Sequence, residues 1–210
     1  PQITQFKMFK QFKTNSIILF QGDSITDCGR DRVDPDSLGN GYVNLIMETI
    51  SDRYSQSNLK FINRGISGDK IRDLQLRWDM ECIDLKPDML SILVGVNDTL
   101  ITPVELFEEE YRMLLKRTTE ALNAEIILCE PFLLLGDTNA YRDDLNPKIE
   151  TVHMLSEEFS THLLPLDKIF REACSLNPPE YWAPDGVHPT PAGHALIAKS
   201  WIEYVEKTLS

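Results

Sequence analysis

Short apolar segments alternate with longer segments of helical periodicity along most of the chain. Five short segments have the length and composition of strands that are buried on both faces: residues 16–21, 60–63, 89–94, 125–129 and 162–166. Five longer segments repeat apolar residues every three or four positions, as a buried helix face does: residues 43–54, 71–85, 104–118, 146–155 and 190–205. Strands that alternate with helices need crossover connections, so the pattern predicts an α/β protein with a parallel sheet and helices on both faces.

Two of these helices have a recognisable start. Asn146 followed by Pro147 predicts an N-cap and a first helical position, and Thr190 followed by Pro191 predicts the same for the last helix. Residues 175–191 are rich in proline and glycine but lead directly into that helix. We therefore interpret them as a long functional loop and not as a domain boundary.

Length and charge limit the classes of partner. The chain has 210 residues, 42% hydrophobic and 26% charged, with no repeat and no linker, which predicts one globular domain over residues 1–210. The formal net charge of −12 leaves no basic stripe for nucleic acid and disfavours an anionic membrane surface. No window approaches the roughly 18 apolar residues of a membrane-spanning helix. We expect neither nucleic acid nor a membrane as a partner.

The cysteines and the first residues bear on the compartment. Cys28, Cys82, Cys129 and Cys174 are far apart and show neither a C-x-x-C motif nor a zinc-binding spacing. We interpret them as reduced thiols, not as two disulfides, which predicts a reducing compartment. Residues 1–16 contain no unbroken apolar core of signal-peptide length. A cytoplasmic location is expected, and so is a site without a metal ion.

Small or polar residues follow three of the predicted strands. Ser24 follows the strand in IILFQGDSIT, Gly65 follows KFINR, and Asn97 follows MLSILVG. In an open α/β sheet the ligand crevice lies beyond the carboxyl ends of the strands, so these three residues should meet at one edge. Ser24 alone could be a turn residue, but this convergence favours a nucleophile at the end of a rigid strand.

A serine hydroxyl needs a base to become an effective nucleophile, and histidine is the usual base. His153 lies in a periodic helix and His162 leads into a strand, so we expect both to be structural, and His194 could pack locally at the start of the last helix. His188 lies in the irregular loop PDGVHP, three residues after Asp185. A tight turn can bring that carboxylate to the ring nitrogen that faces away from serine, where it would fix the tautomer. Asp185 and His188 are therefore the predicted acid and base.

Acyl transfer also requires donors aimed at the developing oxyanion. The backbone N–H of Ser24, the backbone N–H of Gly65 and the side-chain amide of Asn97 are the candidates. For Asn97 alone, a turn-forming role in GVND is an equal alternative.

With these residues assigned, the chain resembles the SGNH hydrolases, also called GDSL esterases and lipases. Four blocks match in order, namely GDSI with Ser24, NRGISG with Gly65, GVND with Asn97, and DGVH with Asp185 and His188. The resemblance spans nearly the whole chain, and the one departure in the first block is isoleucine in place of the leucine of the family's name. It implies a flavodoxin-like, three-layer α/β/α sandwich around a parallel five-stranded sheet.

The segments GDSITDCGR, GYV and NRGISGDKIRDLQLRW most resemble bacterial acetylxylan esterases and related carbohydrate deacetylases. The resemblance implies a serine esterase that removes short acyl groups, most often acetyl, from carbohydrate hydroxyls through an acyl-enzyme on Ser24. The substrate would be a small-molecule or oligosaccharide ester, with no cofactor and no metal. Homo-oligomers are common among the similar deacetylases, so we expect one here.

Three alternatives stay open. A lipase or lysophospholipase could use the same residues, with the segment PFLLLGD at residues 131–137 supplying an apolar acyl surface. A flavodoxin-like module could bind a ligand at the same strand ends without chemistry, although it would not need an activated serine. An interaction protein with a decayed site is a third class, but no key position is missing.

An aromatic pair precedes the predicted acid. Tyr181 and Trp182 lie four and three residues before Asp185, and an aromatic face can stack on the apolar face of a sugar ring. Packing beneath the loop is the alternative role of Trp182. We expect Trp182 to be a substrate-binding residue.

Overall fold

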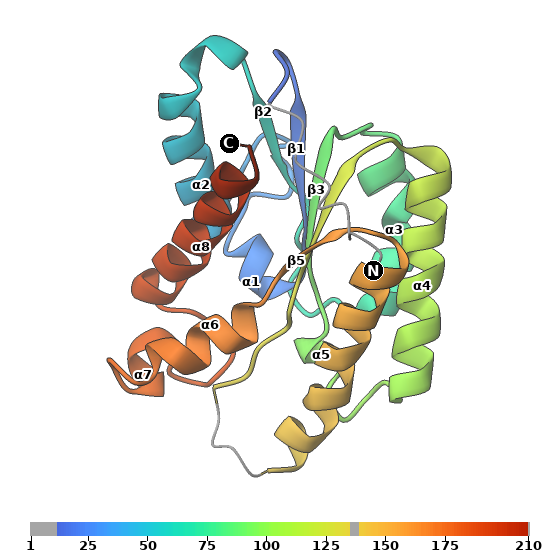
Figure 1. Ribbon diagram of the computed structural model, residues 1–210, viewed down its shortest axis with the longest axis vertical. Helices are drawn as coiled ribbons and strands as arrows, with labels where there is room; N and C mark the ends of the chain where they lie inside the picture. Colours follow the sequence, from blue (N-terminus) through green and yellow to red (C-terminus); the bar gives the residue numbers. More distant parts are fainter. Residues whose placement is uncertain (1–11, 135–138, 210) are drawn as a thin grey trace, which may run out of the picture.

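Five parallel strands form one sheet in a computed structural model that describes residues 12–134 and 139–209 (Figure 1). The strands are β1 Ile17–Gly22, β2 Lys60–Asn63, β3 Met89–Leu93, β4 Glu125–Cys129 and β5 His162–Leu164, in the spatial order β2-β1-β3-β4-β5. Each matches one predicted strand to within two residues at either end. The predicted parallel sheet is therefore confirmed.

Helices cover both faces of the sheet (Figure 1). The α-helices are α1 Ser24–Asp27, α2 Tyr42–Arg53, α3 Ile71–Trp78, α4 Val104–Ala121, α5 Ala140–Glu158, α6 Leu166–Ala173, α7 Pro179–Trp182 and α8 Pro191–Leu209. Single turns of other helix types are η1 Ser55–Ser57, η2 Asp79–Ile83 and η3 Val96–Asp98; η2 is π-helical and continues α3. One apolar core lies between the sheet and α2, α6 and α8, and a second lies between the sheet and α3, α4 and α5. This is the predicted three-layer α/β/α sandwich.

Strand β1 shows why the predicted strands are continuous apolar runs. In β1, Ile18 and Phe20 point into the core beneath α2 and α8, whereas Leu19 points into the core beneath α3 and α4. All three are fully buried. Because successive side chains of a strand face opposite sides, a strand covered on both faces needs apolar residues at every position.

The predicted start of one helix is wrong. Helix α5 begins at Ala140, seven residues before Pro147, which lies inside the helix. Its N-cap is Asn139, whose side chain accepts from the Arg142 N–H at 2.9 Å. Pro147 removes one helix hydrogen bond, but burial of residues on both sides of it, such as Leu145 and Val152, keeps the helix continuous.

The other predicted helix start is correct, and three α-helices among the described residues are additions. Helix α8 begins at Pro191, and Thr190 Oγ1 accepts from the Gly193 N–H at 3.2 Å. The additions are α1, α6 and α7: α1 and α7 are only four residues long, and α6 begins at Leu166, the last residue assigned to the preceding strand. No helix within residues 12–134 and 139–209 combines the length and apolarity that a bilayer crossing requires.

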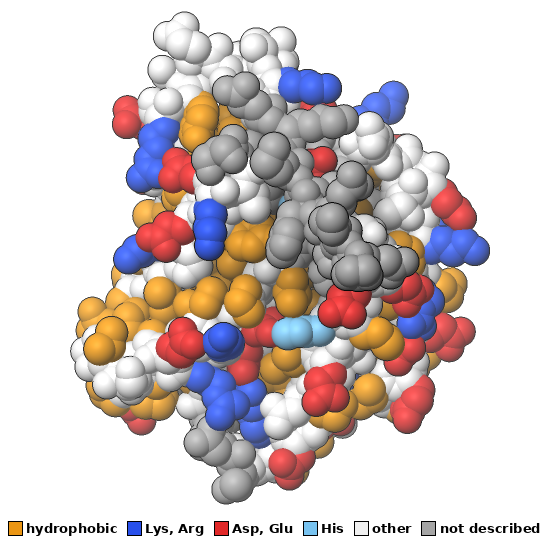
Figure 2. All heavy atoms as spheres, in the orientation of Figure 1, with side chains coloured by type: hydrophobic (Ala, Val, Ile, Leu, Met, Phe, Trp, Pro, Cys, Tyr) orange, Lys and Arg blue, Asp and Glu red, His pale blue; other side chains and the backbone are white. Residues whose placement is uncertain are grey.

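Acidic and basic side chains are interspersed on the face of the molecule in Figure 2, and apolar side chains gather over the region of α7 and α8. Leu176 and Tyr181, which flank the start of α7, are 81% and 50% exposed.

Trp78 should contribute strongly to stability. Its side chain is fully buried between α3 and α4, and its indole N–H donates to Thr118 Oγ1 at 2.9 Å. We expect Trp78→Ala to lower the free energy of unfolding by about 3–5 kcal/mol, because it leaves a large cavity and removes the hydrogen bond that Thr118 Oγ1 accepts. Urea unfolding would measure the change. Leu76→Ala on the same helix is the control, since Leu76 is 78% exposed and its loss should cost less than about 0.5 kcal/mol. Equal midpoints for the two variants would contradict this assignment.

Candidate active site

Strand β1 delivers Ser24 to the edge of the sheet. The strand ends at Gly22, Asp23 caps the short helix α1 by accepting from the Ile25 N–H at 3.0 Å, and Ser24 is the first residue of that helix. A side chain at Gly22 would bring its Cβ to 2.4 Å from the Leu93 carbonyl oxygen, so only glycine fits where β1 meets β3. The tight exit from the strand leaves Ser24 partly exposed.

The structure brings Ser24, His188 and Asp185 together. Ser24 Oγ lies 2.9 Å from His188 Nε2, and His188 Nδ1 lies 2.6 Å from Asp185 Oδ2. Both the acid and the base are more than half exposed at their side chains. The three residues come from opposite ends of the chain and form a continuous hydrogen-bonded series.

A tight turn orients Asp185 toward the histidine. Its Oδ1 accepts from the backbone N–H groups of Val187 at 2.9 Å and His188 at 2.7 Å, while Gly186 adopts φ +80°. Burial raises the pKa of Asp185, but the hydrogen bonds from the His188 ring and from these two N–H groups outweigh it and lower the pKa to about 2. The group is therefore a carboxylate at neutral pH. His188 Nδ1 must then carry the proton, which leaves the lone pair of Nε2 facing the serine hydroxyl.

The other histidines have partners elsewhere. His153 Nε2 contacts Glu130, and His162 contacts the Tyr204 hydroxyl at 3.2 Å. His194 Nδ1 accepts from the Tyr42 N–H at 3.1 Å, and its ring stacks on the Tyr42 ring. Burial lowers the pKa of His194 to about 4, so this ring is neutral and structural.

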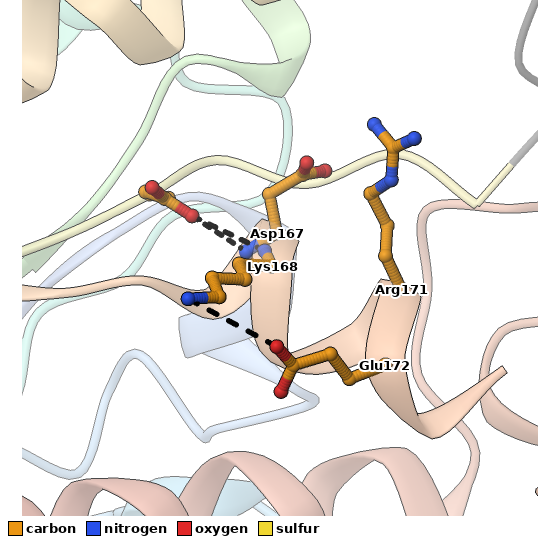
Figure 3. A pocket seen from close by; sticks show the side chains of 5 residues that line it. Asp167, Lys168, Arg171 and Glu172 are labelled. Carbon is orange, nitrogen blue, oxygen red and sulfur yellow. Dashed lines mark hydrogen bonds and ion pairs between the residues drawn. The ribbon is translucent and has the colours of Figure 1, made fainter. Parts of the chain in front are cut away.

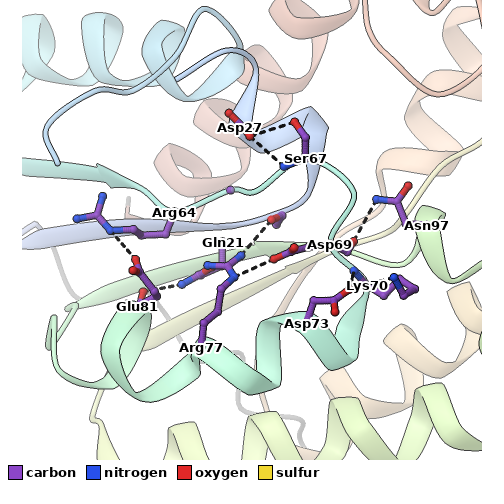
Figure 4. Close-up of polar contacts among 12 residues, drawn as sticks. Gln21, Asp27, Arg64, Ser67, Asp69, Lys70, Asp73, Arg77, Glu81 and Asn97 are labelled. Atoms are coloured by element: carbon purple, nitrogen blue, oxygen red, sulfur yellow. Dashed lines mark hydrogen bonds and ion pairs between the residues drawn. The ribbon is translucent and has the colours of Figure 1, made fainter. Parts of the chain in front are cut away.

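Asn97 lies on η3, directly after β3. Its Nδ2 donates to the Asp69 carbonyl oxygen at 3.1 Å, which leaves its second amide hydrogen for another acceptor (Figure 4). Within residues 12–134 and 139–209, the Ser24 N–H has no hydrogen-bond acceptor. Both groups are therefore available as donors at the carboxyl edge of the sheet.

Gly65 does not fit its predicted role. Its N–H donates to Asn63 Oδ1 at 2.8 Å and is buried, so it is not free to bind an oxyanion. A Cβ at this position would lie 2.4 Å from the Asp27 nitrogen, so the glycine is required for close packing against α1. The prediction failed because Asn63, the last residue of β2, is held by donating to the Thr26 and Leu38 carbonyls, which turns its side-chain oxygen toward this N–H.

Gly68, three residues further along, has the properties that Gly65 lacks. It is exposed, adopts φ +90° in a turn closed by the Asp69 N–H and the Ile66 carbonyl at 3.1 Å, and has open space around a built Cβ. Its N–H has no acceptor in the part of the chain that the structure describes. The second glycine of NRGISG was the available signal, since a glycine in a loop at a strand end permits positive φ.

Trp182 has packing contacts. Its indole N–H donates to the Asn177 carbonyl at 3.2 Å, its ring packs partly buried against the core beneath α8, and Tyr181 meets it edge-on at 4.8 Å between ring centroids. Its role in substrate binding stays a prediction.

The segment considered as an acyl surface is largely core where it is described. Phe132, Leu133 and Leu134 are at most 7% exposed. Residues 135–137, the remainder of that segment, lie outside the described residues.

A pocket of about 430 Å³ lies beside α6 and contains none of the predicted site residues (Figure 3). Its lining includes the buried Glu130, whose Oε2 accepts from the backbone N–H groups of Asp167 at 3.0 Å and Lys168 at 3.3 Å. Glu130 therefore caps the start of α6, where an acidic side chain is stabilised by the helix dipole.

Comparison with known proteins agrees with this fold. Residues 20–196 match the GDSL-like Lipase/Acylhydrolase family. An acetylxylan esterase from Geobacillus stearothermophilus is 32% identical over 203 residues, which cover 90% of this chain and 93% of the relative.

Two solved structures have the same fold. One, of a GDSL-like lipase from Parabacteroides merdae, is 39% identical with a TM-score of 0.89, and the match covers 93% of this chain and 98% of that one. The other, of the Geobacillus stearothermophilus acetylxylan esterase, is 29% identical with a TM-score of 0.87, over 93% and 96% of the two chains. Because the family match covers most of its length and the relatives are aligned almost end to end, the chain belongs to the GDSL-like lipase/acylhydrolase family and is an esterase.

Proposed function

We propose that this esterase acts through an acyl-enzyme formed on Ser24, with His188 as general base and Asp185 as its orienting carboxylate. The observation that carries the proposal is the hydrogen-bonded series from Ser24 Oγ to His188 Nε2 at 2.9 Å and from His188 Nδ1 to Asp185 Oδ2 at 2.6 Å. A flavodoxin-like binding module has no use for such a series, and membership of a hydrolase family argues against that alternative.

In the acylation step, Ser24 Oγ attacks the ester carbonyl carbon while His188 Nε2 takes the hydroxyl proton. The Asp185 carboxylate stabilises the imidazolium that forms, and the same proton is then given to the leaving alkoxide. Water repeats the sequence on the acyl-enzyme, with His188 again as base, and releases the acid and free Ser24.

We further propose that the oxyanion is bound by the Ser24 N–H, the Gly68 N–H and the Asn97 side-chain amide. Preorganised donors of this kind stabilise the charge that develops in the transition state. Gly68 takes the place of Gly65 in this set, because the Gly65 N–H is already bonded to Asn63.

The proposed substrate is a short acyl ester, most often acetyl, of a carbohydrate hydroxyl. The Geobacillus stearothermophilus relative is an acetylxylan esterase by name, and Tyr181, half exposed beside Trp182, offers an aromatic surface just before Asp185. A lipase is the second candidate, since another relative is named as one. The burial of residues 132–134 favours the short-chain ester, because a lipid site needs an exposed apolar surface. The homo-oligomer and the cytoplasmic location stay predictions.

Ser24→Ala should lower kcat by a factor on the order of 10⁶, because nucleophile and base act as a unit. Asp185→Ala should cost less, about 10⁴, since the base is still present. Hydrolysis of p-nitrophenyl acetate and labelling by a fluorophosphonate probe would measure both. Ser175→Ala is the control, since Ser175 is exposed and its hydroxyl donates only to the Glu172 carbonyl. More than a tenth of the wild-type rate in Ser24→Ala would rule out the acyl-enzyme.

Asn97→Ala should reduce kcat by about 10²–10³ and change KM little, because an oxyanion donor acts mainly in the transition state. Steady-state kinetics with p-nitrophenyl acetate would separate the two constants. A change confined to KM would instead make Asn97 a residue that binds the ground state.

The proposed substrate class predicts faster turnover of acetyl than of octanoyl esters and release of acetate from acetylated xylo-oligosaccharides. A chain-length series of p-nitrophenyl esters and an acetate assay would test this. Trp182→Ala should weaken turnover of the sugar substrate more than turnover of p-nitrophenyl acetate, and equal effects would assign Trp182 to packing alone. Faster octanoyl turnover with no acetate released would favour the lipase.

A further inference from the structure

We propose that Arg77 and Asp69 form a positioning unit that holds the loop of residues 65–70, and through it Asn97, in a fixed position relative to the strand that precedes Ser24. This inference rests on the proposed function, because it assigns a purpose to the oxyanion donors named there. Neither residue touches the reacting atoms in the proposed mechanism, so both are positioning residues.

Arg77 reaches from α3 to the end of β1 and to the loop at the same time (Figure 4). Its Nε donates to Asp69 Oδ2 at 2.8 Å, its Nη1 donates to Gln21 Oε1 at 3.0 Å, and its Nη2 makes a longer contact of 3.4 Å to the Gly22 carbonyl. Gln21 and Gly22 are the last two residues of β1, directly before Asp23 and Ser24. One guanidinium therefore ties the nucleophile's strand to the loop.

Asp69 carries the connection on to Asn97. Its carboxylate accepts from Arg77, and its backbone carbonyl accepts from Asn97 Nδ2 at 3.1 Å. A shift of Asp69 would therefore move the acceptor that sets the orientation of the Asn97 amide. Gly68, whose N–H is another of the proposed donors, is the residue directly before Asp69 in the sequence.

Burial strengthens the ion pair between Arg77 and Asp69. The side chains of Arg77 and Asp69 are each 13% exposed, so solvent screens their interaction only weakly. The guanidinium also has a planar set of donors in fixed directions, which lets it fix three acceptors at once. Lysine keeps the positive charge but lacks that geometry.

Packing of α3 does not require this arginine. The helix is anchored by Ile71, Leu74 and Trp78, all fully buried, and its first N–H is capped by Asp98 Oδ2 at 3.1 Å. The Arg77 guanidinium instead directs its donors at the loop and the strand end. This distribution of contacts indicates a role in the geometry of the site.

The test compares Arg77→Lys and Asp69→Asn with a matched control, using p-nitrophenyl acetate as substrate. Each variant should lower kcat by about 10- to 100-fold with KM within about twofold, because a small misplacement of transition-state donors affects the rate and not substrate binding. Arg117→Lys is the control. Arg117 also donates to α3, at Gln75, and to Asp79 just beyond it, but no contact links it to residues 65–70, and its kcat should stay unchanged.

Rates are normalised to the number of serines labelled by a fluorophosphonate, so that loss of folded protein is not counted as loss of kcat. A normalised kcat equal to that of wild type in both variants, with only a lower melting temperature, would overturn the inference and leave Arg77 a structural residue. Effects as large in Arg117→Lys would overturn it as well.

A double-mutant cycle distinguishes this inference from the proposed function. In an Asn97→Ala background, Arg77→Lys should lower kcat by a smaller factor than it does in the wild type, because one of the donors that it positions is already absent. An equal factor in the two backgrounds would show that Arg77 does not act through Asn97 and would overturn the inference. The proposed function fails separately, if Ser24→Ala stays active or if Asn97→Ala alone leaves kcat unchanged.

Discussion

The parallel pairing of β1 with its two neighbours is the constraint on which the site depends. In the β1–β3 ladder Gly22 pairs with Leu93, and in the β1–β2 ladder Phe20 pairs with Asn63. These registers bring the residues after each strand to the same edge, so that Ser24, Asn97 and the loop of residues 65–70 lie together. A slip by one residue would turn every side chain of β1 to the opposite face, where it would have to pack against the other set of helices, so close packing on both faces fixes the register.

The two aspartates near Ser24 differ in exposure. Asp23, directly before Ser24, is buried, whereas Asp185 and its partner His188 are exposed. Asp23 is 1% exposed, and burial raises its pKa to about 7 against the opposing effect of its hydrogen bond from the Ile25 N–H. Asp185 is the opposite case, because three hydrogen bonds overcome the effect of burial and hold its pKa at about 2. The pKa values of these two carboxyl groups near Ser24 are therefore shifted in opposite directions. Only Asp185 is suited to stabilise an imidazolium, because it is the one that is fully ionised at neutral pH.

Charged side chains from several helices hold the loop and the residues that carry the proposed oxyanion donors. Asp27, on the same short helix as Ser24, accepts from the Ser67 N–H at 2.9 Å, and Asp98, next to Asn97, caps α3. Arg77 then connects α3 to β1 and to Asp69. The loop that carries Gly68 is thus held from the nucleophile's helix on one side and from α3 on the other, which is how an exposed turn can present a backbone N–H in a fixed direction.

The sequence by itself determined the layered α/β architecture, the five strands, and the residues Ser24, Asn97, Asp185 and His188 that follow strands or share a tight turn. These follow from local rules, since buried strands need apolar runs and a three-residue spacing suffices to bring Asp185 to His188. Only the tertiary structure decided which glycine keeps a free N–H, because the Asn63 side chain that accepts from Gly65 is itself held by the distant carbonyls of Thr26 and Leu38. It also decided that α5 passes through Pro147 and that Arg77 joins Gln21 to Asp69, 56 and 8 residues away in the chain. These outcomes depend on contacts between distant segments, and neither periodicity nor local spacing carries that information.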